Sequence, residues 1–264
     1  MTGRRQSEGA EMEQREQVLC AILDAGELLL TAGAEVARVE DTIRRMAQAY
    51  GFGRVDVLTI TASMIVTAQA EDGAVLTQTR RILRRETDMR RIEAVNALSR
   101  AVCGAPLPLE ELRARVEAIR TMRDDMPWRI PLAYLVISGS FAVFFGGSVR
   151  DGLAAMLCSM VLYAIGRMGA RIALQPLVLT VLSAAAMCLA AVITVEAGLG
   201  QALDKIIIGN IMLLIPGIAL VNSLRDMIVG DTISGLLGAC EALLRAIAIA
   251  AGCALVLLQL GGAV

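Results

Sequence analysis

Residues 130–149 read IPLAYLVISGSFAVFFGGSV, a run of 20 residues without a charged side chain. As a helix this run would be about 30 Å long, which is the thickness of the hydrocarbon core of a bilayer. Four further apolar stretches follow it, at 152–166, 177–195, 206–221 and 246–264. Charges are scarce there, because residues 130–264 hold only 5 Arg, 1 Lys and 6 Asp or Glu. The second half of the chain therefore predicts five transmembrane helices.

The first half has a different composition. Residues 1–129 hold 19 Arg and 20 Asp or Glu, and its apolar residues recur at helical and strand spacings. The pattern predicts helices over 12–50 (divided at Gly33, the second over 35–50), 87–103 and 108–122, and strands over 54–60, 62–69 and 74–80. We therefore expect an α-helical polytopic membrane protein, with an N-terminal cytosolic α+β domain over 1–125 and a five-helix transmembrane domain over 126–264.

The arginines predict the orientation of the chain. The N-terminal residues have no apolar core that would make a signal peptide, so we expect the N-terminus to stay in the cytosol. With that orientation, the inner segments carry Arg129, Arg167, Arg171 and Arg225, and the outer loops carry Arg150 and Lys205. The excess of positive charge inside agrees with a cytosolic first half.

The absence of certain residue types and motifs from the sequence excludes several classes of function. The chain has no histidine, so neither a Ser-His-Asp nor a Cys-His nucleophile can form, and the commonest metal ligand is lacking. The cysteines form no CxxC pair and are expected to be small buried residues. They are Cys20, Cys103, Cys158, Cys188, Cys240 and Cys253. The net charge of −1 gives no support for nucleic-acid binding. We predict no enzyme, no catalytic residue, no metal and no cofactor.

A run of arginines stands between the strands and the third helix. It comprises Arg80, Arg81, Arg84, Arg85, Arg90 and Arg91. It is either a solvated helix face, neutralised by nearby Glu86, Asp88 and Glu93, or a contact surface for anionic lipid or an acidic partner.

The fourth apolar stretch carries the polar residues that suggest a substrate site. Asn210 lies in its first half, Pro216-Gly217 interrupts it, and Asn222, Arg225 and Asp226 follow. A broken helix at membrane depth can hold a small polar solute near the midplane. We expect Arg225 to bind a carboxylate and Asp226 to bind an ammonium group or orient Arg225. Asn210, Asn222 and carbonyls near Pro216-Gly217 would complete the site. The alternative is a simple proline kink.

Three more charged residues lie close to the fifth stretch. Glu241 and Arg245 are four positions apart and can pair on one helix face, either structurally or in coupling. Asp231 and Glu241 are the carboxylates beside the last span, so they are the candidates for a proton relay.

Two stretches resemble one family. GELLLTAGAEVARVEDTIRRMAQAYG (26–51) resembles the N-terminal domain of the threonine/serine exporters. PGIALVNSLRDMIVGDTISGLLGACEALLRA (216–246) resembles their PG…N…RD…GD…SG…EA pattern. The family's RVE element corresponds to Arg38-Val39-Glu40, which is either a helix-surface ion pair or a contact in a cytosolic vestibule or gate.

The resemblance implies a secondary transporter subunit in a bacterial cytoplasmic (inner) membrane. Family members export small amino acids or, in two-subunit systems, dicarboxylates such as succinate. This chain resembles the first half of full-length members, so the resemblance implies a second small five-span subunit, or a homo-oligomer. No GxxxxGK[ST] sequence for ATP occurs. The alternatives are a non-transporting accessory or sensor subunit and a membrane-anchored hydrolase, against which the lack of His and of a GxSxG sequence argues.

Overall fold

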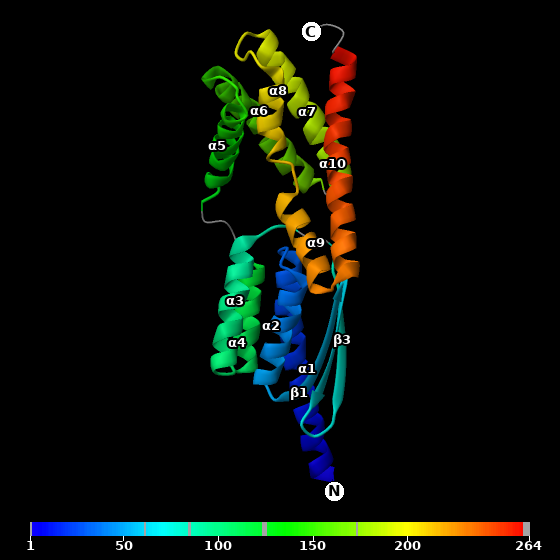
Figure 1. Ribbon diagram of the computed structural model, residues 1–264. Coiled ribbons are helices and arrows are strands. Elements are labelled where there is room, and N and C mark those ends of the chain that lie inside the picture. The colour runs from blue at the N-terminus through cyan, green and yellow to red at the C-terminus, as the bar shows by residue number, and fades with distance from the viewer. Residues whose placement is uncertain (1, 61, 84–85, 123–125, 173, 261–264) are drawn as a thin grey trace. The chain divides into compact units, whose positions relative to one another are not determined.

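The chain forms two compact units in a computed structural model that describes residues 2–60, 62–83, 86–122, 126–172 and 174–260 (Figure 1). The mixed unit comprises Met1–Arg123 and Ile218–Ala239, and the helical unit comprises Asp124–Gly217 and Cys240–Val264. The sequence predicts a single boundary, between residues 125 and 126. In the structure each unit is built from two separate pieces of chain.

The mixed unit contains the predicted helices and strands. They are α1 (Thr2–Thr31), α2 (Val36–Ala49), β1 (Phe52–Ile60), β2 (Ser63–Ala70), β3 (Val75–Arg81), α3 (Met89–Gly104) and α4 (Leu109–Arg120). The strands form an antiparallel sheet in the order β1-β2-β3. The predicted division at Gly33 is confirmed, since this glycine adopts φ +83° between α1 and α2.

One face of the sheet packs on the helices of the mixed unit. Alternate residues of β2, among them Met64 and Val66, are buried with Leu19 and Ile22 of α1. The helices α1 and α2 approach closely at Gly26, where a Cβ atom would lie 2.6 Å from Cδ1 of Ile43. The buried residues of β2, which alternate along the strand, and those of α1, which recur at helical spacing, therefore form one apolar core.

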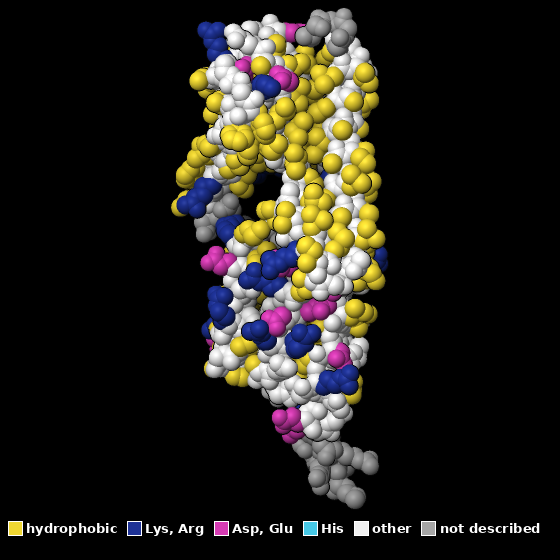
Figure 2. Space-filling view, in the orientation of Figure 1, with side chains coloured by type: hydrophobic (Ala, Val, Ile, Leu, Met, Phe, Trp, Pro, Cys, Tyr) yellow, Lys and Arg dark blue, Asp and Glu magenta, His cyan; other side chains and the backbone are white. Residues whose placement is uncertain are grey.

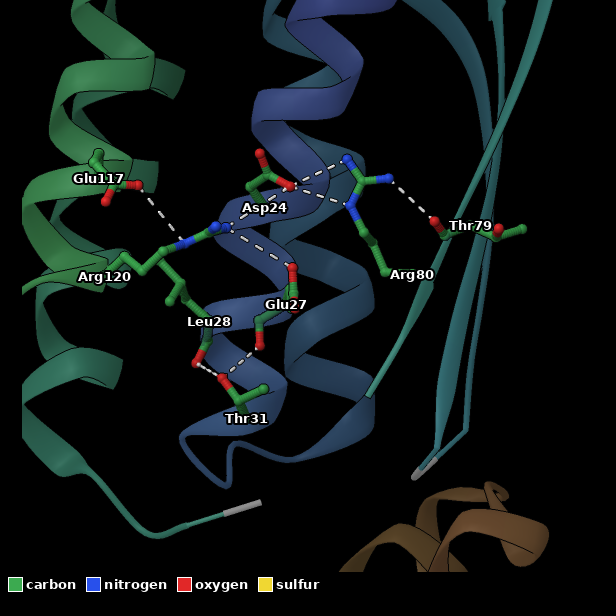
Figure 3. Close-up of polar contacts among 8 residues, drawn as sticks. All are labelled: Asp24, Glu27, Leu28, Thr31, Thr79, Arg80, Glu117 and Arg120. Atoms are coloured by element: carbon green, nitrogen blue, oxygen red, sulfur yellow. Dashed lines mark hydrogen bonds and ion pairs between the residues drawn. The ribbon is translucent and has the colours of Figure 1, made fainter. Parts of the chain in front are cut away.

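The arginine run does not form one helix face. Arg80 lies on β3, where its Nε donates to Oδ1 of Asp24 on α1 at 3.1 Å (Figure 3). Arg120 of α4 lies 3.9 Å from both Asp24 and Glu27, so the α1 carboxylates link the sheet to α4. Arg91 does pair with Asp88, as expected, at 3.4 Å.

The interpretation of the run as one helix face neutralised by nearby acids is therefore wrong for Arg80, because the sheet brings it to a carboxylate distant in sequence. Arg81 lies on β3 too, and Arg84 and Arg85 fall outside the described residues.

The helical unit contains four whole helices and most of a fifth. They are α5 (Arg129–Phe144), α6 (Val149–Arg171), α7 (Pro176–Glu196), α8 (Leu203–Ile211) and the part of α10 (Thr232–Leu260) that follows Ala239. Small residues allow close packing, since a Cβ atom at Gly209 would lie 2.6 Å from the carbonyl oxygen of Ser138. On the face shown in Figure 2, hydrophobic side chains cover most of α7 and α10.

A buried carboxylate joins two of these helices. Asp151, 2% exposed, forms a capping box with Ser148 at the start of α6. Its other oxygen accepts the backbone N–H groups of Gln201 (2.6 Å) and Ala202 (2.9 Å), just before α8. The first turns of α6 and α8 are therefore tied to one side chain.

Within the described residues, three helices are long and apolar enough to cross a membrane: Val149–Gly169, Pro176–Glu196 and Thr232–Leu260. The first two coincide with the predicted second and third spans, and the last begins fourteen residues before the predicted fifth span. Residues 261–264, the end of the predicted fifth span, lie outside the described residues. These helices are those of a membrane protein.

The first and fourth predicted spans differ from the structure. The helix α5 has 16 residues and ends at Phe144, whereas the prediction ran to Val149. Gly146 (φ +95°) turns the chain, and the Ser148 capping box then starts α6. The fourth stretch is divided between α8 and α9 (Gly217–Val229), because Pro216 cannot continue a helix that began before it.

Candidate functional site

The predicted break at Pro216-Gly217 is present. The chain leaves α8 at Ile211 and enters α9 at Gly217, and from Ile218 onward it belongs to the mixed unit. The amides inside the break are bonded locally: Leu214 donates to Ile211 (2.8 Å) and Gly217 donates to Ile215 (2.9 Å). The break is a tight turn that connects the two units.

The helix α9 packs on the turn between α1 and α2. The side-chain amide of Asn222 donates to the carbonyl oxygen of Gly33 at 3.1 Å. One turn farther along α9, Nη1 of Arg225 donates to Oε1 of Glu35 at 2.8 Å. Two of the residues predicted for substrate binding therefore lie together within the mixed unit, on one face of α9.

The acidic partner of Arg225 is Glu35, whereas the sequence suggested the adjacent Asp226. Neighbouring positions on a helix point about 100° apart, so Asp226 turns inward and is 5% exposed. The Arg225 side chain is 65% exposed and that of Glu35 is 23% exposed. Glu35 stands at the N-cap of α2 without capping it, so its carboxylate is directed to Arg225. Glu35 lies inside the resembling stretch 26–51, three residues before the RVE element, and no role was predicted for it.

A second group of contacts surrounds Thr59 at the end of β1. Its backbone N–H donates to Oε1 of Glu40 on α2 at 2.8 Å, and its carbonyl oxygen accepts the hydroxyl of Ser234 on α10 at 3.3 Å. Thr59 and Ser234 are each 3% exposed. One strand residue therefore bonds both helices, a role that sequence reasoning did not assign to it.

The charge environment of Glu40 is unusual for this domain. Burial raises the pKa of Glu40 above its ordinary value, and the negative charge of Asp231 raises it further. The Thr59 amide and the positive charge of Arg44 act in the opposite direction. Of the predicted coupling residues, Asp231 thus lies close enough to Glu40 to act on its carboxyl group within the mixed unit.

Arg38, the other predicted residue of the RVE element, is exposed on α2. Its carbonyl oxygen accepts the hydroxyl of Thr42 at 2.8 Å. Among the described residues its side chain makes no ion pair. The interpretation of Arg38 and Glu40 as a surface ion pair is therefore wrong, because Glu40 turns toward the β1 backbone.

Glycines explain much of the second sequence pattern. Gly230 adopts φ +110° in the turn from α9 to α10. A Cβ atom at Gly235 would lie 2.5 Å from the carbonyl oxygen of Ser223, so α9 and α10 can pack this closely only with glycine there. The glycines of the GD…SG pattern therefore allow the turn that brings Asp231 close to Glu40 of α2 and Ser234 to Thr59 of β1.

The remaining predicted residues lie in the helical unit. Asn210 is fully buried, and its side-chain amide donates to the carbonyl oxygen of Ile206 at 2.9 Å, while its Oδ1 has no partner among the described residues. Glu241 is exposed and Arg245 is half-buried. No ion pair joins these two described side chains, although their spacing allows one. The predicted residues thus fall into two separate groups.

The cysteines divide into two kinds. Cys158, Cys188 and Cys253 are buried, as expected, and Cys20 is partly buried. Cys103 and Cys240 are exposed, so the prediction was wrong for them. In the described part of the chain, no three acidic or cysteine side chains gather where they could hold a metal ion.

One family model matches most of the chain. Its description is "Putative threonine/serine exporter" (ThrE), and the match covers residues 21–260. The matched range includes the α1–α2 turn, the break at Pro216 and the α9–α10 turn. No curated protein and no solved structure matches the chain. With both resembling stretches inside one continuous match, the chain belongs to the ThrE family of threonine/serine exporters.

Proposed function

We propose that the chain is a subunit of a secondary transporter that exports small amino acids of the threonine and serine type. The observation that carries the proposal is the family match over residues 21–260, which spans both units. The three membrane-length helices agree with it. In this proposal the N-terminus lies in the cytosol of a bacterium, and α5 and the α8–α9 region complete five passages through the cytoplasmic membrane.

The residues proposed to recognise the solute are Arg225, Asn222 and Asn210. The guanidinium of Arg225 is well suited to bind a carboxylate, and its side chain is largely exposed. Asn222 fixes α9 on the α1–α2 turn. Asn210 would act at a later stage within the membrane, where an unpartnered buried amide oxygen can accept a hydrogen bond from a polar solute.

A second five-span subunit is proposed to complete the pathway, with a homo-oligomer as the alternative assembly. Paired halves of this kind give the inverted repeats of many secondary transporters. The coupling ion is proposed to be the proton. Asp231, Glu40, Glu241 and Arg245 are the candidate groups, and the raised pKa of Glu40 supports its inclusion.

Succinate is the competing solute, because Arg225 would also accept one of its carboxylates. The 2.8 Å contact between Arg225 and Glu35 weighs against it, since a dianion would meet a like charge there. A non-transporting sensor subunit is the competing role.

The test is efflux from cells that are preloaded with labelled threonine, serine or succinate. Cells would express the chain alone, its proposed partner subunit alone, or both together. We expect threonine and serine efflux, and we expect Arg225→Ala to reduce it to background while the protein stays in the membrane. Arg45→Ala, which breaks an exposed pair with Asp41, is the control and should export normally. Export by the partner alone would favour the sensor role, and normal export by Arg225→Ala would refute the site.

A further inference from the structure

The ion pair between Glu35 and Arg225 joins residues farther apart in sequence than the other ion pairs among the described residues of the mixed unit, such as Arg15–Asp72 and Arg120–Asp24. Pairs such as Arg45–Asp41 and Arg115–Glu111 join residues four apart on one helix. Glu35 and Arg225 are 190 residues apart and come from a turn and from α9. This pair is therefore set by the packing of the chain, and the family match includes both of its members.

Both charges of this pair remain open to a ligand. The Arg225 side chain is 65% exposed, and its contact with Glu35 uses one terminal nitrogen, Nη1. A guanidinium carries five N–H donors, so a second carboxylate can bind its other edge. Glu35 contributes Oε1 to the pair and makes no cap with its own helix, which leaves Oε2 as an acceptor.

We propose that Glu35 and Arg225 together form a receptor site for a zwitterion, in which Arg225 binds the α-carboxylate and Glu35 binds the α-ammonium group of an amino acid. The inference rests on the proposed function and adds the residue that recognises the ammonium group of its amino-acid substrate. In an α-amino acid the two charged groups are attached to a single carbon. A site with opposite charges 2.8 Å apart can contact both groups at once.

Glu35 is then the residue that selects amino acids over dicarboxylates. A dicarboxylate places its second negative charge beside the Glu35 carboxylate, where like charges repel. A carboxylate solute without the ammonium group gains nothing from Glu35. Asp226, which was predicted to bind an ammonium group or to orient Arg225, is buried on another face of α9.

The experiment measures transport into inside-out membrane vesicles, whose outer surface is the cytosolic face. Vesicles contain the full chain with its partner subunit, and the initial rate of labelled threonine uptake gives KM. Unlabelled succinate and N-acetylthreonine, which lacks the ammonium charge, are added as competitors. The variants are Glu35→Gln, the conservative Glu35→Asp, and Glu111→Gln as a matched control that breaks the exposed 2.6 Å pair with Arg115.

We expect Glu35→Gln to raise the KM for threonine about tenfold, the loss expected for one charge-assisted contact. The same variant should bind succinate and N-acetylthreonine at least as well as the wild type, so the preference for threonine falls. Glu35→Asp keeps the charge and should keep the preference. Glu111→Gln should match the wild type.

A purely structural role for the pair predicts a different result. Glu35→Gln would then weaken the binding of threonine, succinate and N-acetylthreonine by the same factor. An unchanged ratio of the affinity for threonine to the affinity for either competitor overturns the inference. Failure of the wild type to take up threonine or serine would instead overturn the proposed function. Immunoblots of the vesicles confirm that each variant is present. If Glu35→Gln does not fold, the wild type decides, because equal competition by unlabelled threonine and N-acetylthreonine would overturn the inference.

Discussion

Removing the buried carboxylate of Asp151 should loosen the helical unit more than any other single change to its charges. The carboxylate accepts four hydrogen bonds, from the N–H and hydroxyl of Ser148 (2.8 and 2.7 Å) and from the N–H groups of Gln201 (2.6 Å) and Ala202 (2.9 Å). Its 2% exposure means that water cannot take over these bonds without a local opening.

The expected magnitude follows from these contacts. A hydrogen bond to a charged acceptor contributes roughly 1.5–3 kcal/mol, and such contributions within one cluster do not add fully. We expect Asp151→Ala to lower the free energy of unfolding by about 4 kcal/mol, because it leaves buried amides without an acceptor. Asp151→Asn keeps one acceptor oxygen, so its loss should be about 2 kcal/mol. At 2–4 °C per kcal/mol, the alanine variant should melt about 10 °C below the wild type.

The three buried cysteines of the helical unit provide the assay. A thiol-reactive fluorogenic dye labels the exposed Cys103 and Cys240 before heating, whereas it labels Cys158, Cys188 and Cys253 only when the helices separate, so the rise in fluorescence above this starting level during heating in detergent reports unfolding. Asp204→Ala is the control, since this exposed residue pairs only with its neighbour Lys205 at the surface and should shift the midpoint by less than about 2 °C. Equal melting midpoints for Asp151→Ala and Asp204→Ala would refute the claim that the buried Asp151 carboxylate stabilises the helical unit by joining the starts of α6 and α8.

Two further predictions concern packing and protonation. Gly209→Val should lower the melting midpoint by several degrees, because its Cβ would lie 2.6 Å from the carbonyl oxygen of Ser138 on α5 and overpacking costs roughly 1–3 kcal/mol. Gly217→Val is the control: no atom from elsewhere in the described chain lies within 4 Å of its Cβ position, so its midpoint in the same thermal assay should change little. Glu40→Gln should stabilise the protein at neutral pH, because burial raises the pKa of the native carboxyl and its ionised form therefore destabilises the fold. The gain should shrink as the pH falls toward the ordinary value of 4.5, and melting curves of both proteins from pH 7 to pH 4.5 would show a constant gap if this reasoning is wrong.

Local patterns predicted most of the mixed unit. The strand β2 alternates between buried and exposed residues, and α2 buries residues at helical spacing, so each element could be found from its own sequence. Gly33 and Pro216 marked the breaks for the same reason, because their backbone preferences act on neighbouring residues. The helix ends were less accurate where charged or polar residues lie inside a helix, as at the start of α10.

Long-range partners could not be predicted in this way. Arg225 meets Glu35, and Ser234 meets Thr59, across 190 and 175 residues of chain. Such contacts depend on how whole elements pack, and periodicity in one segment carries no information about the other. The sequence therefore predicted Arg225 as a site residue with the adjacent Asp226 as its acidic neighbour, whereas in the fold its ion-pair partner is Glu35 from the α1–α2 turn.

The two exposed cysteines have a practical consequence. Cys103 lies in the mixed unit and Cys240 lies in the helical unit, while the thiols of Cys158, Cys188 and Cys253 are shielded. The wild-type chain thus already carries one reactive thiol on each unit. Spin labels or a donor–acceptor dye pair at these two positions would report the separation of the units during a transport cycle, without a single engineered residue.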